Sequence, residues 1–134
     1  MNILIIGATR GIGFQLLEQT LKAGHTVTAL VRDPTKLKIK NERLKVIKGD
    51  ILDLYSVQQA MAEQDAVCSC IGVSLTLKPV TVFSHGTKNV LQAMALFRVK
   101  KLISVTGIGA GDSRGHGEFL YNKMASLPGA NCQR

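Results

Sequence analysis

The apolar residues of this chain fall into short runs that are separated by segments with helical spacing. The runs over 2–6, 26–31, 44–47, 66–71 and 102–105 predict five strands. The first run is apolar almost throughout, without the alternation of a half-exposed strand, which is typical of a strand buried on both faces of a sheet.

Between these runs, apolar residues recur three and four positions apart, as in amphipathic helices. This spacing predicts helices over 12–23, after Asp53 and after Pro79. Gly24 is suited to end the first helix, Asp53 to cap the second, and Pro79 to stand in the first turn of the third. The expected inner faces are Leu54, Val57, Ala60 and Met61 in the second helix and Phe83, Val90, Leu91 and Met94 in the third.

Strands that alternate with helices through short connections indicate an α/β fold of three layers. We expect a doubly wound parallel sheet of about five strands with helices on both faces. A length of 134 residues suits one domain, which we place at 1–126. Within it, a short helix is expected over 118–126, and 127–134 is expected to be an irregular tail.

A glycine-rich turn, GATRGIG at residues 7–13, joins the first strand to the first helix. Gly7 permits a sharp turn, Gly11 lets the backbone approach a pyrophosphate, and Gly13 lets the helix pack closely on the strand. The helix N-terminus adds free N–H groups and the positive end of the helix dipole. A tight turn that binds nothing is the alternative, but the motif and its strand–helix context together favour a dinucleotide.

With this G-x-x-x-G-x-G spacing, the chain resembles the short-chain dehydrogenase/reductase superfamily. The best local matches are similar to its atypical NAD(P)H-binding members, such as NmrA-like proteins and the biliverdin/flavin reductases. The resemblance extends to about Tyr121 and rests on GATRGIG, LVRDPTKL, KGDILD, and GTKNVLQAM with KKLISVTG. It implies a three-layer, Rossmann-type fold with the strand order 3-2-1-4-5 and a nicotinamide dinucleotide, and it says little about the substrate.

The end of the second strand bears on which dinucleotide binds. Arg32 favours a 2′-phosphate, because a guanidinium donates two parallel hydrogen bonds to it, whereas Asp33 would favour the ribose 2′-hydroxyl. Adjacent strand residues point in opposite directions, so the two are not expected to face the site together. We expect NADP(H) rather than NAD(H), with Lys36 and Arg10 as further positive charges. The alternative makes Arg32 and Lys36 surface charges and lets Asp33 bind the ribose.

The resemblance implies further cofactor contacts. Asp50 would bind the adenine amino group and Ile51 would pack on its ring, the backbone of residues 70–72 would pass a ribose, and Thr106 would lie beside the nicotinamide. The full predicted cofactor set is Gly7, Thr9, Arg10, Gly11, Ile12, Gly13, Arg32, Lys36, Asp50, Ile51, Cys70, Ile71, Gly72 and Thr106.

No catalytic residue is assigned. The common members of the superfamily use a Tyr-x-x-x-Lys pair, whereas this chain has Tyr121-Asn122-Lys123, which would not align the two side chains. Hydride transfer from the nicotinamide to a flavin, a quinone or a similar conjugated acceptor needs few catalytic side chains, because the cofactor supplies the chemistry. The resulting hypothesis is an NAD(P)H-dependent oxidoreductase, and the alternative is a non-catalytic dinucleotide-sensing regulatory or interaction module.

The formal net charge of +8 is concentrated between Arg32 and Lys48, where seven basic residues stand against two acidic ones. A nucleic-acid binder is the weakest hypothesis, because the chain has only two Tyr and four Phe for base stacking and no zinc-finger signature. The three cysteines lack further ligands at zinc spacing, so no metal site is expected. There is neither a run of roughly 20 apolar residues nor a secretory signal, so we expect a cytoplasmic protein without a membrane partner.

Members of the resembling family continue well past the fifth strand, whereas this chain stops soon after Tyr121. A truncated product, a short isoform and a fragment are all open explanations. A fifth strand left at the edge of the sheet is an association hazard, which predicts a homodimer or another partner across that edge.

Overall fold

The computed structural model describes residues 1–72 and 81–105 of the chain. One parallel sheet contains five strands in the order β3-β2-β1-β4-β5, as predicted. The strands are β1 (Asn2–Ile6), β2 (Thr26–Val31), β3 (Leu44–Lys48), β4 (Ala66–Ser69) and β5 (Leu102–Ser104). The helices of this described part are α1 (Gly11–Lys22), α2 (Leu54–Met61), α3 (Val82–Phe97) and a 3₁₀ turn, η1 (Pro34–Lys36).

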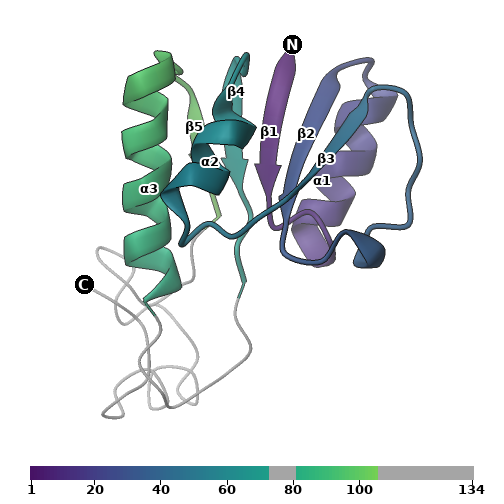
Figure 1. Ribbon diagram of the computed structural model, residues 1–134. Helices are drawn as coiled ribbons and strands as arrows, with labels where there is room; N and C mark the ends of the chain where they lie inside the picture. The colour runs from purple at the N-terminus through teal and green to yellow at the C-terminus, as the bar shows by residue number, and fades with distance from the viewer. Residues whose placement is uncertain (73–80, 106–134) are drawn as a thin grey trace, which may run out of the picture.

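The sheet is the middle of three layers, with α1 on one face and α2 and α3 on the other (Figure 1). Side chains of β1 alternate between the two cores: Leu4 and Ile6 pack with α2 and α3, and Ile5 packs with α1. Leu4 and Ile5 are fully buried. The continuous apolar sequence of β1 therefore reflects its central place between two helix layers.

The inner face of α3 differs from the predicted one. Val90 and Met94 are buried as expected, but Leu91 is 52% exposed, so its prediction was wrong. Consecutive residues of an α-helix are about 100° apart, and once Val90 points inward, Leu91 turns toward solvent. Ala93 takes the place in the core that was expected of Leu91.

Strand β4 ends at Ser69, two residues earlier than predicted. The Cys70 amide still donates to the Ile6 carbonyl at 2.8 Å, but Ile71 lies beyond the strand. Ile71 instead lines the cavity described below. Its apolar side chain fits a strand and a binding loop equally well, so the sequence alone could not distinguish them.

Several predictions fall on residues that the structure does not describe. They are the position of Thr106, the domain boundary at 126, the short helix over 118–126, and the tail over 127–134. Pro79, predicted in the first turn of the third helix, also lies outside the described residues, and α3 begins at Val82.

The C-terminus of α3 provides a test of how the helix is ended. Arg98 caps it in the left-handed conformation, with φ of 58°. A glycine adopts this conformation without a Cβ penalty, which for other residues is roughly 1–2 kcal/mol. We expect Arg98→Gly to raise the free energy of unfolding by about 1 kcal/mol in urea denaturation. Arg98→Ala is the control, and an equal gain in that variant would contradict the explanation.

Candidate functional site

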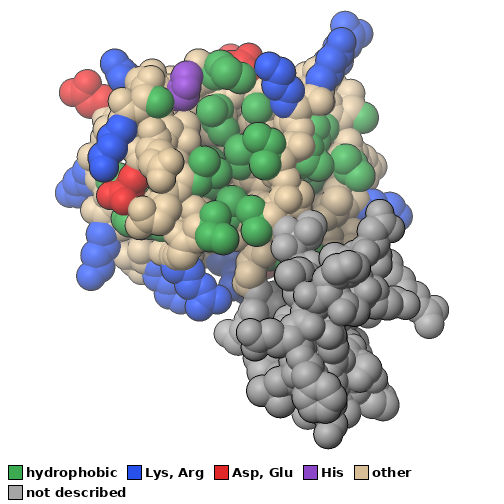
Figure 2. Space-filling view, turned by 180° about the vertical axis from the view of Figure 1, so that it is seen from behind, with side chains coloured by type: hydrophobic (Ala, Val, Ile, Leu, Met, Phe, Trp, Pro, Cys, Tyr) green, Lys and Arg blue, Asp and Glu red, His purple; other side chains and the backbone are tan. Residues whose placement is uncertain are grey.

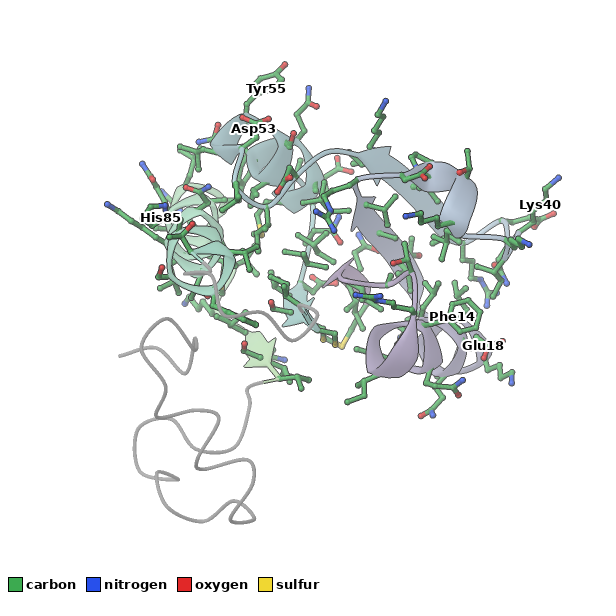
Figure 3. The ribbon with its side chains drawn as sticks, turned by 90° about the horizontal axis from the view of Figure 1, so that it is seen from below. Phe14, Glu18, Lys40, Asp53, Tyr55 and His85 are labelled. Atoms are coloured by element: carbon green, nitrogen blue, oxygen red, sulfur yellow. The ribbon has the colours of Figure 1, made fainter. Side chains whose placement is uncertain are left out.

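A cavity of about 1010 Å³ opens where the carboxyl ends of the parallel strands meet. Its lining comes from the segments that follow β1, β2, β3 and β4, from the beginning of α3, and from Val105 just after β5. Figure 3 looks onto this end of the sheet, with α1 on one side and α2 and α3 on the other. The chain runs from β1 to β2 in one direction and from β4 to β5 in the other, so the cavity lies at the topological switch point, where open α/β sheets bind ligands.

The glycine loop forms the floor of the cavity and has little room for side chains. Gly7 has φ of +87°, and a Cβ added to it would collide with the backbone carbonyl of Cys70. A Cβ on Gly13 would collide with the carbonyl of Gly7. Gly11, with φ of +56°, differs, because beyond its chain neighbours and the backbone of its own helix no atom lies within 4 Å of its Cβ position, and the residue lines the cavity. Two glycines thus hold helix and strand together, and Gly11 leaves space for a ligand.

The N-terminus of α1 faces this space without a protein cap. Its N-cap residue, Arg10, forms no side-chain cap hydrogen bond, and the first turn holds no acidic residue. The first helical amide with a backbone partner is that of Phe14, which donates to the Arg10 carbonyl at 3.4 Å. Backbone N–H groups in this arrangement fit a phosphate, since each lacks an internal acceptor and the helix dipole favours an anion there.

The two residues at the end of β2 that compete for the ribose, Arg32 and Asp33, both line the cavity, contrary to the expectation that they would not face the site together. Arg32 is exposed and lines the cavity, as does Lys36. One oxygen of the Asp33 carboxylate is engaged within its own turn, where Oδ1 accepts from the Thr35 amide at 3.1 Å and from the Thr35 hydroxyl at 2.6 Å. These two hydrogen bonds, and more weakly the charges of Lys36 and Lys48, lower the pKa of Asp33.

The turn after β3 is held rigidly. One oxygen of Asp50 accepts from the Leu52 amide at 2.9 Å, and the Asp53 amide donates to the Asp50 carbonyl at 3.0 Å. Asp50, Ile51 and Leu52 all line the cavity. Ile51 is only 6% exposed, however, whereas Leu52 is 47% exposed and offers the larger apolar surface. Leu52 was missed at the sequence level, because nothing in KGDILD distinguishes which of its two apolar residues points outward.

Residues 70–72 close the opposite wall of the cavity. Burial raises the pKa of the Cys70 thiol, and burial and then the neighbouring thiol raise the pKa of Cys68. Both sulfurs are therefore neutral thiols near neutral pH and serve as packing groups. In the described ranges, no cluster of three or more His, Cys, Asp or Glu side chains could hold a metal ion.

The predicted cofactor residues that the structure describes all line this cavity, apart from Gly13, which lies buried beneath the loop. The sequence did not indicate Thr81 and Val82 at the start of α3, which also line it. They follow no strand and belong to no glycine motif, so only the packing of α3 brings them to the site. Within the described part of the chain, neither histidine nor tyrosine lines the cavity, and Tyr55 and His85 lie on α2 and α3 (Figure 3).

Comparison with known proteins agrees with this geometry. Residues 7–129 match the model of a protein family described as NAD(P)H-binding. The chain belongs to this NAD(P)H-binding family. The resemblance to short-chain reductases and the expected binding of a nicotinamide dinucleotide are thereby confirmed at the level of the family.

Curated relatives of this NAD(P)H-binding protein include several reductases. Cinnamoyl-CoA reductase 1 of Petunia hybrida is 32% identical over 81% of the chain, and the match covers 35% of that protein. Isoflavone reductase homolog P3 of Arabidopsis thaliana is 36% identical over 62% of the chain and 30% of its own length. The photosystem II assembly factor Ycf39 of Synechocystis is 29% identical over 98% of the chain and 39% of its own length. The chain thus spans only about a third of these relatives.

Solved structures show the same fold. A Rossmann-fold NAD(P)-binding family protein from Shigella flexneri superposes with a TM-score of 0.69 at 27% identity, over 92% of this chain and 59% of that one. ChuY, an anaerobillin reductase from Escherichia coli O157:H7, gives a TM-score of 0.78 at 20% identity, over 96% and 61% of the two chains. None of the described helices is long and apolar enough to cross a membrane.

The glycine loop gives a test that separates packing from ligand binding. Gly13→Ala places a methyl group against a backbone carbonyl, and we expect a large fall in Tm even without ligand. In Gly11→Ala the added methyl group meets open space, and the cost is the strain of an alanine at positive φ. The Tm of this variant should therefore fall by no more than about 5 °C, which corresponds to roughly 1 kcal/mol. The stabilisation that NADPH gives should nevertheless be lost in Gly11→Ala, because the methyl group occupies the phosphate cradle. An undiminished NADPH-induced shift would contradict this assignment.

Proposed function

We propose that this chain is the cofactor-binding part of an NADP(H)-dependent oxidoreductase that reduces a flavin, a quinone or a similar conjugated acceptor. The observation that carries the proposal is the open cradle at Gly11, beside an uncapped helix N-terminus and beneath a cavity at the switch point of the sheet. The presence of several reductases among the relatives supports the same class of chemistry.

The preference for NADP(H) follows from how charge is distributed at the end of β2. Arg32 and Lys36 bring two positive charges to the cavity wall, and Asp33 is engaged with Thr35. With the two cations set against the single Asp33 carboxylate, the net charge at this end of the cavity favours a 2′-phosphate over a 2′-hydroxyl. Arg10 in the glycine loop adds a third positive charge on the lining.

The proposed reaction asks little of the protein beyond binding and orientation. NADPH would give one hydride to the acceptor and a proton from solvent would complete the reduction, leaving NADP⁺ and the acceptor reduced by two electrons. The chain would hold the pyrophosphate at α1 and the 2′-phosphate at Arg32 and Lys36. No acid or base is assigned among the described residues, which suits an acceptor that takes a hydride into a conjugated ring.

A non-catalytic, dinucleotide-sensing module is the second candidate. It is favoured by the similarity to a protein named as an assembly factor, which extends over 98% of this chain. Steady-state NADPH oxidation with flavin and quinone acceptors separates the two. We expect turnover that depends on the acceptor, and tight NADPH binding without any turnover would favour the sensing module instead.

Arg32 provides the test of cofactor preference. A charge-assisted hydrogen bond pair is worth about 1.5–3 kcal/mol, so Arg32→Ala should weaken NADPH binding by roughly 10- to 100-fold and leave NADH binding unchanged. The control is Lys40→Ala, which removes an exposed cation of the same basic segment at a position that does not line the cavity (Figure 3). Equal affinities for NADPH and NADH in the unmutated protein, measured by titration, would refute the preference.

The two outer strands of the described sheet, β3 and β5, differ in their exposed side chains, and this difference suggests self-association through β5. Edge strand β3 carries the exposed Lys45 and Lys48, which discourage pairing. At the other end, Ile103 of β5 is 63% exposed and the adjoining Val105 is 38% exposed. Figure 2 shows hydrophobic side chains gathered on the middle of the face that carries α1, with lysines and arginines around its margin.

We therefore expect two copies to associate through the β5 side of the sheet. Ile103→Lys should shift the protein to the monomer in sedimentation velocity, because it places a charge where a partner would cover an apolar residue. Val46→Lys on β3, at a position 38% exposed, is the matched control and should leave association unchanged. A monomeric unmutated protein at the same concentration would refute this arrangement.

A further inference from the structure

A hydrogen bond joins α3 to the turn after β3, which lines the cavity. The side-chain amide of Asn89 donates from Nδ2 to the backbone carbonyl of Ile51 at 2.9 Å, across 38 positions of sequence. Asn89 lies about two turns into α3, and Ile51 lies in the turn between β3 and α2. The bond is partly buried, so it is shielded from competition with water.

Gly86 makes the second contact between α3 and the same residue. A Cβ at this position would lie 2.9 Å from Cδ1, 3.0 Å from Cγ1 and 3.1 Å from Cγ2 of Ile51. The Ile51 side chain therefore rests directly on the backbone of α3, which explains why it is only 6% exposed. Helix α3 thus holds Ile51 at two points, the side chain at Gly86 and the carbonyl at Asn89.

Fixing Ile51 also fixes its two neighbours. The Asp50 carboxylate accepts from the Leu52 amide at 2.9 Å, which spans Ile51 and ties the turn together. Asp50 and Leu52 line the cavity on either side of Ile51, and Asn89 does not line it. Asn89 therefore acts on the cavity only through the turn that it holds.

We propose that Asn89 is a positioning residue that sets the adenine end of the cofactor site. This inference rests on the proposed function, which assigns the Asp50 turn to adenine. By holding the Ile51 carbonyl, Asn89 would keep the Asp50 carboxylate in place to accept from an adenine amino group and would keep Leu52 exposed as an apolar surface for the ring. The donor is the essential feature, because an aspartate of the same shape would place a negative charge against the Ile51 carbonyl.

The test compares NADPH with its reduced hypoxanthine analogue, which has a carbonyl in place of the adenine amino group. We expect the unmutated protein to prefer NADPH. Asn89→Ala and the near-isosteric Asn89→Asp should each weaken NADPH binding by about three- to tenfold, the effect of one lost hydrogen bond, and should bring the affinity ratio of the two dinucleotides close to one. Gln92→Ala, which removes an exposed amide from the same helix, is the control and should preserve both the affinity and the ratio.

Each outcome bears on a different statement. If the unmutated protein fails to bind NADPH, the proposed function fails and this inference fails with it. If it binds NADPH without discriminating against the hypoxanthine analogue, the adenine assignment of the Asp50 turn is wrong. If discrimination survives in both Asn89 variants, the positioning role alone is refuted. A merely structural role would lower Tm and weaken both dinucleotides equally, leaving their ratio unchanged.

Discussion

The close approach of Gly13 to the carbonyl of Gly7 is the constraint on which the rest of the site depends. It presses the first turn of α1 onto the end of β1, and the matching contact of Gly7 with the Cys70 carbonyl brings in the segment after β4. Because β1 is the central strand and is buried on both faces, this point is fixed by two hydrophobic cores. The uncapped amides of α1 are thereby aimed at the cavity, and any side chain larger than hydrogen at either glycine would move them.

Features set by local chemistry were predictable from the sequence, and features set by distant packing were not. The strands follow from periodicity, and the strand order and the glycine loop follow from a motif in its context and the family that it resembles. The outward turn of Leu91 depends on how α3 is rotated against the sheet, which its apolar pattern leaves open. The bond from Asn89 to Ile51 links two segments 38 positions apart, and a single asparagine on a helix carries no signal of such a partner.

The charge of the chain shows why position matters more than composition. Seven basic residues between Arg32 and Lys48 look alike in sequence, yet among them only Arg32 and Lys36 line the cavity. Asp33 lines the cavity as well, and its Oδ1 accepts two hydrogen bonds from Thr35 that lower the pKa of the carboxyl. In the alternative left open by the sequence, Asp33 would bind the ribose through Oδ2, the oxygen that Thr35 does not hold.

The cavity is assembled so that its two ends are held by different helices. At the phosphate end the ligand would meet backbone amides of α1. Their position is fixed by the packing of α1 on β1 and depends on no particular side chain. At the Asp50 end the turn has no regular helix or strand to define it, and its shape comes from contacts with α3 at Gly86 and Asn89. Since α3 also contributes Val82 to the lining, a movement of this helix would change both the Asp50 turn and the wall beside residues 70–72. In the proposed site, recognition of the phosphate would therefore depend on the centre of the fold, whereas recognition of the base would depend on how α3 packs against the Asp50 turn.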